Sequence, residues 1–195
     1  MRKLVFIFLC LISLKIFSQE KENNTRYFPV EYILKTSNDI IKGKVRNIGI
    51  FSNKKYSDMT ILFDIQMLND AGNKTMVKPQ KIKYIKIQNP ADGSFHEFFA
   101  STDKFGEEAG LVKVLFEGKK INWYKDYVNS ALSVQVIIKG YLVDNNKNII
   151  FKGFFDSSKN QIKKIFKQYP DLMDKVDSAR TEEDYIKILQ LYDAK

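Results

Sequence analysis

The stretch 111–128, LVKVLFEGKKINWYKDYV, decides how the fold of this chain is read. Residues 111–116 and 121–128 are rich in β-branched and aromatic side chains, and the segment between them contains Gly118. This pattern predicts a β-hairpin in which Gly118 adopts a positive φ angle. Because successive side chains of a strand point to opposite faces, Trp123 and Tyr127 should share one face, and Tyr124 should lie on the other.

Similar strand and turn signals extend from this hairpin in both directions. Residues 60–68 show the clearest alternation, with apolar side chains at 61, 63, 65 and 67 on one face. Gly43, inside another predicted strand, indicates a bulge or a close backbone approach. Residues 102–110 are predicted to form a polar loop. The remaining predicted strands are residues 30–35, 40–50, 74–77, 81–88, 95–101, 132–143 and 148–155.

The periodicity changes to that of helices after residue 155. Apolar residues at 162, 165, 166 and 169 have the spacing of an amphipathic helix. Pro170 stands where a second helix can begin, and Thr181 and Asp184 are spaced as the capping box of a third. The sequence therefore predicts a mainly β (α+β) fold. We expect an antiparallel sheet or barrel-like meander of about 8–10 strands, followed by a short C-terminal helical segment.

The first eighteen residues have the layout of a secretory signal peptide, with a cationic start, an apolar run and Ser18 before the expected cut. The run over residues 4–14 is shorter than the roughly 20 residues that a membrane-spanning helix needs. A lipoprotein cut before Cys10 would need small preceding residues, which are absent. We expect export to the periplasm, the outer membrane or the medium, with no transmembrane span after cleavage. The predicted organisation is 1–18 signal peptide, 19–26 disordered lead, 27–156 antiparallel β domain and 157–195 C-terminal helices packed on that domain.

Removal of residues 1–18 would change the chemistry open to the protein. It would take away Cys10, the single cysteine, so that disulfides, thiol nucleophiles and thiolate metal sites are excluded. It would also lower the formal net charge from +9 to +6, because the segment holds Arg2, Lys3 and Lys15 and no acidic residue. Nucleic acid is not an expected partner, since exported proteins rarely meet it and the lysines are spread along the chain.

Few residues suggest a catalytic or metal site. His96 is the only histidine, and its aromatic neighbours favour a structural or surface role. Residues 144–148 resemble the start of a calcium loop, but Ile149 and Phe155 stand where such a loop needs Gly and Glu. A glycosidase would need two carboxyl groups about 5–9 Å apart. The candidates for such a pair are Glu107, Glu108, Asp64 and Asp126.

Several short stretches together resemble a family. They are EYILKTSNDIIKGKV at 31–45, VKPQKIKYIKI at 77–87, LFEGK at 115–119 followed by Trp123 and Tyr124, and FKQYPDL at 166–172. These stretches resemble the opening hairpin, later strands and terminal helices of a group of exported, β-rich proteins of Bacteroidota. The resemblance implies a β-rich exported domain and brings no catalytic residue with it. Tyr169 stands where those relatives often carry Cys.

We therefore expect a non-catalytic exported domain that binds a partner or ligand, or has a structural part, at the cell envelope. The alternative is a periplasmic or secreted carboxylate-dependent hydrolase acting on glycans. No catalytic residue, cofactor or metal is assigned, and the expected partner is an envelope protein, a glycan or a small ligand. Core packing and a solvated helix face are the simpler explanations of the residues that form the candidate interaction surface. This surface consists of Trp123, Tyr124, Tyr127, Lys159, Lys163, Lys164 and Lys167.

The triplet Asp177-Ser178-Ala179 matches the Asp-Ser/Thr-small pattern that Bacteroidota use for O-glycosylation of exported proteins. If this site is used, the intact mass of the exported protein should correspond to a chain that begins at Gln19 and carries an added glycan. Ser178→Ala should remove the added mass, and Ser37→Ala should not. An unchanged mass in the Ser178 variant would exclude glycosylation there.

Overall fold

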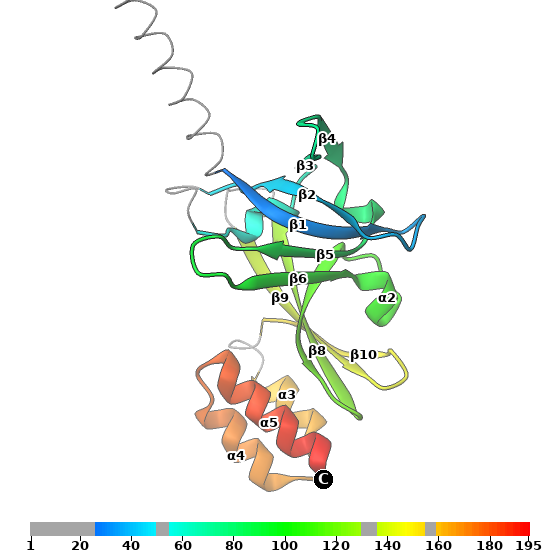
Figure 1. The fold of residues 1–195 in the computed structure, drawn as a ribbon. Coiled ribbons are helices and arrows are strands. Elements are labelled where there is room, and N and C mark those ends of the chain that lie inside the picture. Colours follow the sequence, from blue (N-terminus) through cyan, green and yellow to red (C-terminus); the bar gives the residue numbers. More distant parts are fainter. Residues whose placement is uncertain (1–25, 50–54, 130–135, 155–158) are drawn as a thin grey trace, which may run out of the picture.

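The computed structural model describes residues 26–49, 55–129, 136–154 and 159–195. Ten strands form one antiparallel sheet in the order β10-β9-β8-β7-β6-β5-β1-β2-β3-β4, and short helices follow at the C-terminus (Figure 1). This arrangement confirms the predicted mainly β fold, and the sheet as described is open and not a closed barrel. The predicted signal peptide and lead lie outside the described residues, apart from Arg26.

The bounds of the elements follow the chain in order. The strands are β1 (Tyr27–Leu34), β2 (Ile41–Arg46), β3 (Ile65–Leu68), β4 (Lys74–Val77), β5 (Ile82–Gln88), β6 (Phe95–Ala100), β7 (Leu111–Glu117), β8 (Ile121–Asn129), β9 (Val136–Asp144) and β10 (Ile149–Gly153). The helices are η1 (Asp58–Ile61), η2 (Pro79–Lys81), α2 (Ser101–Phe105), α3 (Lys159–Ile165), α4 (Pro170–Ser178) and α5 (Glu182–Ala194).

The sheet is a meander with one crossover in the described chain. Strands β1 to β4 pair in sequence order, and so do β5 to β10. The connection after β4 returns the chain to the free side of β1, where β5 pairs with it. Strand β1 therefore joins the two runs of strands into one sheet.

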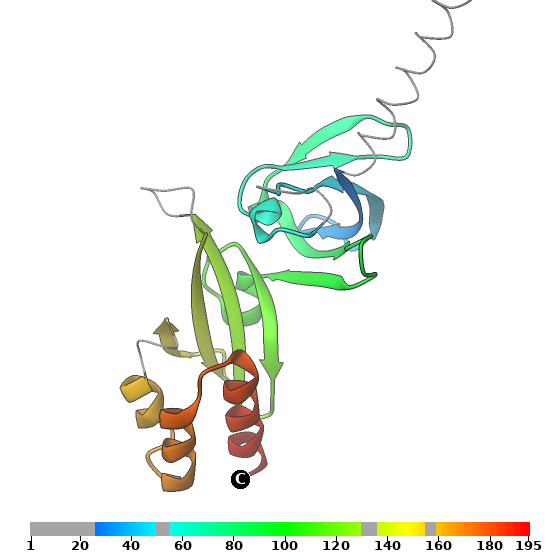
Figure 2. The same cartoon turned by 90° about the vertical axis from the view of Figure 1, so that its left-hand side faces the viewer.

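The sheet changes direction sharply between β6 and β7. These strands share only two residue pairs, Phe99 with Val112 and Ala100 with Leu111. In Figure 1, β1, β5 and β6 run across the view, while β8 descends steeply toward the helices. Figure 2 shows the same division from the side, with β1 to β6 above and the C-terminal helices α3 to α5 below. The long hairpin of β7 and β8 connects the part of the sheet formed by β1 to β6 with the part that packs on the C-terminal helices.

Three groups of buried side chains stabilise the fold, and β8 contributes to all of them. The N-terminal core lies between β1, β2, β3, β5, β6 and η1, and it includes Tyr127 of β8. The helical core lies between β8 to β10 and the helices α3 to α5, and it includes Trp123. A third group on the opposite face of β8 contains Tyr124 and is covered by Phe105 of α2. The predicted division of these three aromatic residues between two faces is confirmed.

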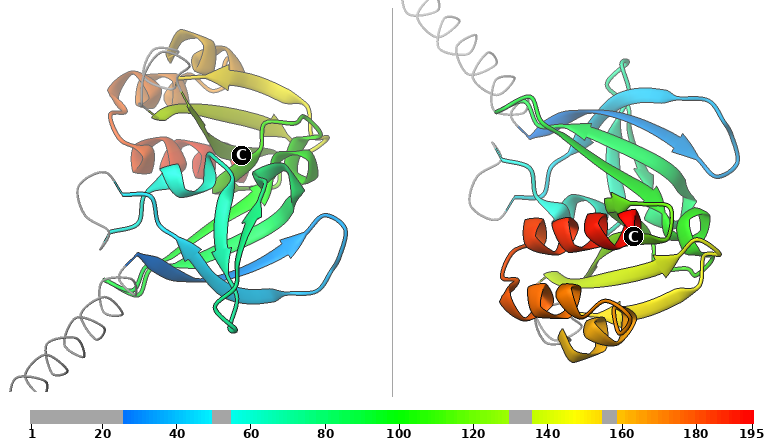
Figure 3. Two further views of the ribbon diagram at one scale, coloured as in Figure 1. Left: turned by 90° about the horizontal axis from the view of Figure 1, so that it is seen from above. Right: turned by 90° about the horizontal axis from the view of Figure 1, so that it is seen from below.

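The C-terminal helices begin where their capping signals predict. Pro170 is the first residue of α4. In α5, the Thr181 side chain accepts a hydrogen bond from the backbone N–H of Asp184, and the Asp184 carboxylate accepts one from the backbone N–H of Thr181, which completes the capping box. In the view from below, the three helices lie next to one another at the near end of the molecule (Figure 3). Among the described residues, no helix is long and apolar enough to cross a membrane.

Three local predictions were wrong, in each case where tertiary packing determines the conformation. Only the end of residues 60–68 is a strand, because the preceding residues form η1 and bury Ile61 in the N-terminal core. Residues 102–110 include most of α2, which buries Phe105. Gly118 is not among the residues with a positive φ angle. Instead, a Cβ atom at Gly118 would lie 2.5 Å from Oδ1 of Asp193 in α5.

The predicted close approach at Gly43 is present and gives a test of the β2–β3 pairing. A Cβ atom there would lie 2.7 Å from the backbone oxygen of Leu68, which cannot move without disturbing β3. Gly43→Ala should therefore lower the free energy of unfolding by about 1–3 kcal/mol. Lys44→Ala, at the exposed neighbouring position, should change it by less than about 0.5 kcal/mol. Urea unfolding followed by circular dichroism measures both, and equal stabilities would contradict the close approach.

Candidate functional site

The two larger cores meet the same face of β8, and the position between them is polar. Trp123 belongs to the helical core and Tyr127 to the N-terminal core. Lys125 lies between these two residues on the same face, and its cross-strand neighbour on β7 is Lys113. Neither core can bury an unpaired ammonium group without a large cost. The junction of the two cores must therefore supply polar partners for these lysines.

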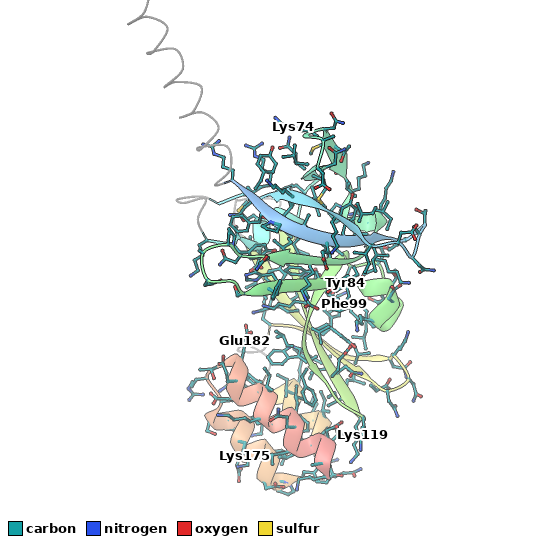
Figure 4. All side chains as sticks on the ribbon, in the orientation of Figure 1. Lys74, Tyr84, Phe99, Lys119, Lys175 and Glu182 are labelled. Carbon is teal, nitrogen blue, oxygen red and sulfur yellow. The ribbon has the colours of Figure 1, made fainter. Side chains whose placement is uncertain are left out.

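A pocket of about 330 Å³ opens at this junction. Its floor comes from β8, β9 and the residue that follows β10, and its wall comes from the α4–α5 connection and the start of α5. We call it the junction pocket. It is lined by Trp123, Lys125, Ile138, Gly140, Phe154, Arg180, Thr181, Glu182 and Tyr185. Figure 4 labels Glu182 at the end of α5 that faces the strands.

An ion pair closes one side of the junction pocket. The ammonium group of Lys125 binds the carboxylate of Glu182, and the Lys125 side chain is only 16% exposed. Glu182 is the first residue of α5, directly after the capping residue Thr181. The capping box thus fixes where Glu182 meets the sheet. The pair supplies the negative partner that Lys125 needs between the two cores.

Arg180 adds a second cation to the rim of the pocket. Its Nη1 donates to the backbone oxygens of Asp177 and Ala179, both at 2.9 Å. Among the described residues, none accepts a hydrogen bond from its Nη2 or Nε. The charged residues that line the pocket are therefore two cations and the single anion Glu182.

The polar junction continues from the pocket toward the N-terminal core. Burial raises the pKa of the Tyr127 hydroxyl, and the nearby carboxyl group of Asp58, which lies in η1, raises it further. Burial raises the pKa of Asp58, while the positive charges of Lys113 and Lys125 oppose this rise. Glu182 adds to the rise, which shows that Asp58 lies within electrostatic reach of the pocket. The junction thus links charged groups from η1, β7, β8 and α5.

His96 lies at the edge of the N-terminal core and takes no part in a triad within the described chain. Its ring stacks on Tyr56 with the centroids 3.8 Å apart. Its Nε2 is buried, and no described residue forms a hydrogen bond with it. Burial lowers the pKa of His96, and Lys113 lowers it further, so the imidazole is neutral near pH 7. The same described residues contain no group of three side chains that could hold a metal ion.

The aromatic residues singled out from the sequence are all buried. Trp123 and Tyr124 are 3% exposed and Tyr127 is 6% exposed. Only Trp123 lines the junction pocket. Tyr124 lies on the opposite face, where its hydroxyl donates to Glu117 at 3.2 Å. These three side chains therefore do not form one accessible surface.

The four lysines of the candidate interaction surface separate into two pairs. Lys159 donates to the backbone oxygen of Ala179 at 2.7 Å, and Lys163 pairs with Asp177 at 2.6 Å, so both hold α3 against the end of α4. Lys164 and Lys167 are exposed. Ser178, the candidate glycosylation site, is exposed at the last position of α4, and its hydroxyl donates to the backbone oxygen of Lys175.

Two of the four candidate carboxyl groups lie within electrostatic reach of Tyr141. Glu107 and Asp126 both raise the pKa of Tyr141, after the larger effect of burial. Glu107 pairs with Lys152, and Glu108 pairs with Lys35. The other candidate, Asp64, is exposed in the segment before β3. None of the four lines the junction pocket.

The predicted hairpin turn explains the residues that resemble a calcium loop. Oδ1 of Asp144 accepts hydrogen bonds from the backbone N–H groups of Asn146 and Asn148, at 2.9 and 2.8 Å. Lys147 takes the one positive φ angle among the described residues other than glycine. The Asp144 carboxylate therefore caps the β9–β10 turn.

Sequence reasoning missed Lys125, Arg180 and Glu182. One signal was present, because Lys125 falls between Trp123 and Tyr127 on an otherwise apolar strand face. Arg180 and Glu182 carry no comparable signal, since only the docking of α5 brings them to β8. The sequence thus indicated the floor of the pocket better than its wall.

Asp126 gives the fold a defined pH dependence. It is 2% exposed, its Oδ1 has no hydrogen-bond partner in the described chain, and burial raises its pKa from 3.8 to about 6. Ionisation of Asp126 therefore requires more free energy in the folded state than in the unfolded state. The free energy of unfolding falls as the pH rises from about 4 through 6. Asp126→Asn removes this cost. The free energy of unfolding of the variant should exceed that of the wild type by up to about 3 kcal/mol at pH 7, and this difference should shrink toward pH 4.

Urea unfolding at pH 4, 5, 6 and 7 measures this difference. Asp70→Asn, in an exposed turn, is the matched control and should stay within about 0.5 kcal/mol of the wild type at each pH. A stability difference for Asp126→Asn that does not change with pH would show that the buried carboxyl group is not responsible.

Comparisons of the chain with protein-family models, with curated proteins and with solved structures found no match.

Proposed function

We propose that this chain is an exported, non-catalytic binding domain of the cell envelope that holds a small acidic ligand in the junction pocket. The observation that carries this proposal is the pocket itself. It is concave, it lies where two packed units meet, and it combines an apolar floor with a few convergent charged groups. Such clefts are the usual sites of small-molecule binding.

The charges favour an acidic ligand. Lys125 is partly neutralised by Glu182, while the guanidinium group of Arg180 uses only Nη1 for protein contacts in the described chain. A guanidinium group has five N–H donors in a planar arrangement that suits a carboxylate. The N-terminus of α5 borders the same space and contributes a positive partial charge.

The floor favours a ligand that also has an apolar face. Ile138 is 42% exposed and Phe154 is 48% exposed at the pocket, beside the buried ring of Trp123. The carbon-bound hydrogens of a sugar ring can lie on such a floor while a carboxylate faces Arg180. A uronic acid unit of an envelope glycan has both properties.

Export is supported by the predicted signal peptide at residues 1–18 and by the resemblance to exported β-rich proteins of Bacteroidota. A binding role needs no cofactor. An acidic glycan of the envelope would be available to the protein in the periplasm or at the outer membrane.

Fluorescence titration tests this proposal, because Trp123 is the single tryptophan of the chain and lines the pocket. Trigalacturonate should cause a saturable change, and the neutral trisaccharide maltotriose should cause none. Arg180→Gln should weaken binding roughly ten- to a hundredfold, since a hydrogen bond to a charged group contributes about 1.5–3 kcal/mol. Arg46→Gln, on the exposed side of β2, is the matched control and should bind like the wild type.

Thermal melting of both variants checks that they are folded, because Arg180 also bonds the end of α4. An equal response to the two sugars, or full affinity in a folded Arg180→Gln variant, would contradict an acidic ligand at this pocket. The absence of any saturable response to trigalacturonate would contradict the ligand class.

A further inference from the structure

Strand β2 presents three exposed cations on one face. Val45 is fully buried in the N-terminal core. Because side chains alternate along a strand, Lys42, Lys44 and Arg46 lie on the opposite face, and all three are exposed. Neighbouring cations in this line are about 7 Å apart, the length of two residues. Nη1 of Arg46 donates to the neutral side chain of Gln66 at 3.3 Å.

A fourth cation on the same face comes from the β3–β4 hairpin. Lys44 pairs with Leu68 of β3, and Leu68 pairs with Lys74 of β4, so these three residues form one row across the sheet. Lys74 is exposed, and Figure 4 labels it at the end of the molecule opposite to Lys175 of the helices. Together, these four residues form the cationic patch, which consists of Lys42, Lys44, Arg46 and Lys74.

The cationic patch has one anionic neighbour in its strands. Glu31 is the single acidic residue of β1 to β4, and it pairs with Lys42 at 3.1 Å. The Lys42 side chain is still 74% exposed, so this pair is weak and easily exchanged. Among the described residues, none forms an ion pair with Lys44, Arg46 or Lys74.

The charged residues just beyond these strands balance one another. Asp64 precedes β3 and Asp70 follows it, while Arg26 precedes β1 and Lys78 follows β4. The four cations of the patch and Glu31 therefore leave this face with a net charge of +3.

Apolar side chains lie among these cations. Leu68 stands between Lys44 and Lys74 and is half-buried, and Met76, on the same face of β4, is 60% exposed. A bilayer of anionic lipids suits such a mixture, because its phosphate groups bind cations while apolar side chains enter the layer of headgroups. A soluble acidic polymer would satisfy the cations alone. The composition of this face thus favours a lipid surface.

We propose that the cationic patch docks the protein on a bilayer that contains anionic phospholipids. The four cations bind lipid phosphates, and the Met76 side chain enters the headgroup layer. The junction pocket shares no residue with the patch, and Glu182, which lines that pocket, lies with the helices in Figure 4. The docked protein therefore keeps the pocket open. This inference does not depend on the proposed ligand of the pocket, and the Trp123 titration does not report on it.

The test measures co-sedimentation with unilamellar vesicles. It uses the protein purified after export, because the apolar residues 4–14 would themselves bind a bilayer. Vesicles of equal amounts of phosphatidylcholine and phosphatidylglycerol should bind the protein, and vesicles of phosphatidylcholine alone should not. Binding should weaken as NaCl is raised, since salt screens exposed charges.

Two double variants with the same net charge locate the contact. Lys44→Glu, Lys74→Glu should weaken vesicle binding at least roughly tenfold. Lys164→Glu, Lys167→Glu changes two exposed lysines at the helical end and should bind like the wild type. Circular dichroism checks that both variants are folded. Equal affinities of the two variants would overturn the proposal.

Met76→Ser separates docking on a bilayer from charge attraction alone. This variant keeps every charge of the patch, and it should bind the anionic vesicles roughly threefold more weakly or less. An affinity equal to that of the wild type would overturn the proposal, because a soluble polyanion would then suit the patch as well. Failure to bind the anionic vesicles, with or without binding of polyglutamate, would also overturn it.

Discussion

The two-residue period of β8 is the constraint on which the rest of the structure depends. Because its side chains alternate, the positions of Trp123, Lys125 and Tyr127 must emerge on one face. The ends of that face are covered by two different layers, the helices and the N-terminal strands. A lysine between them must then be paired, and Glu182 is the group that does so. The polar junction and its pocket are thus direct consequences of placing one charged residue in the middle of a long buried strand.

Local signals predicted the elements whose stability is local. The hairpin of β7 and β8, the start of α4 at Pro170 and the capping box of Thr181 and Asp184 are all present, because each depends on residues close in sequence. Residues 60–61 belong to a stretch that alternates as a strand would, but they lie in η1. The turn of η1 buries the Ile61 side chain in the N-terminal core. There the demand for a buried side chain outweighs the strand preference of the segment.

The candidate site could be predicted only in part for the same reason. Its floor follows from strand alternation, which can be read from residues 121–128. Its wall depends on a contact between Lys125 and Glu182, which lie 57 positions apart. Arg180 reaches the pocket because it precedes the capping residue of α5, and nothing in its local sequence indicates which strand that helix meets. Lys159, Lys163 and Lys164 of α3, with Lys167 just after it, show the opposite case. Their spacing suggested one surface, yet two of them hold α4 and only the other two are exposed.

The close contact between Gly118 and Asp193 has a consequence for the order in which the chain folds. The backbone N–H of Lys120 donates to Asp193 at 2.6 Å across 73 positions of sequence, so the β7–β8 turn gains this partner only when α5 is complete. Domains fold largely from the N-terminus as they are synthesised, and contacts between distant residues form late. The N-terminal core can therefore assemble before α5 is made, while Ile121 and Trp123 are not covered until α5 packs on them. During that interval the strand on which the finished structure depends exposes these apolar side chains to solvent.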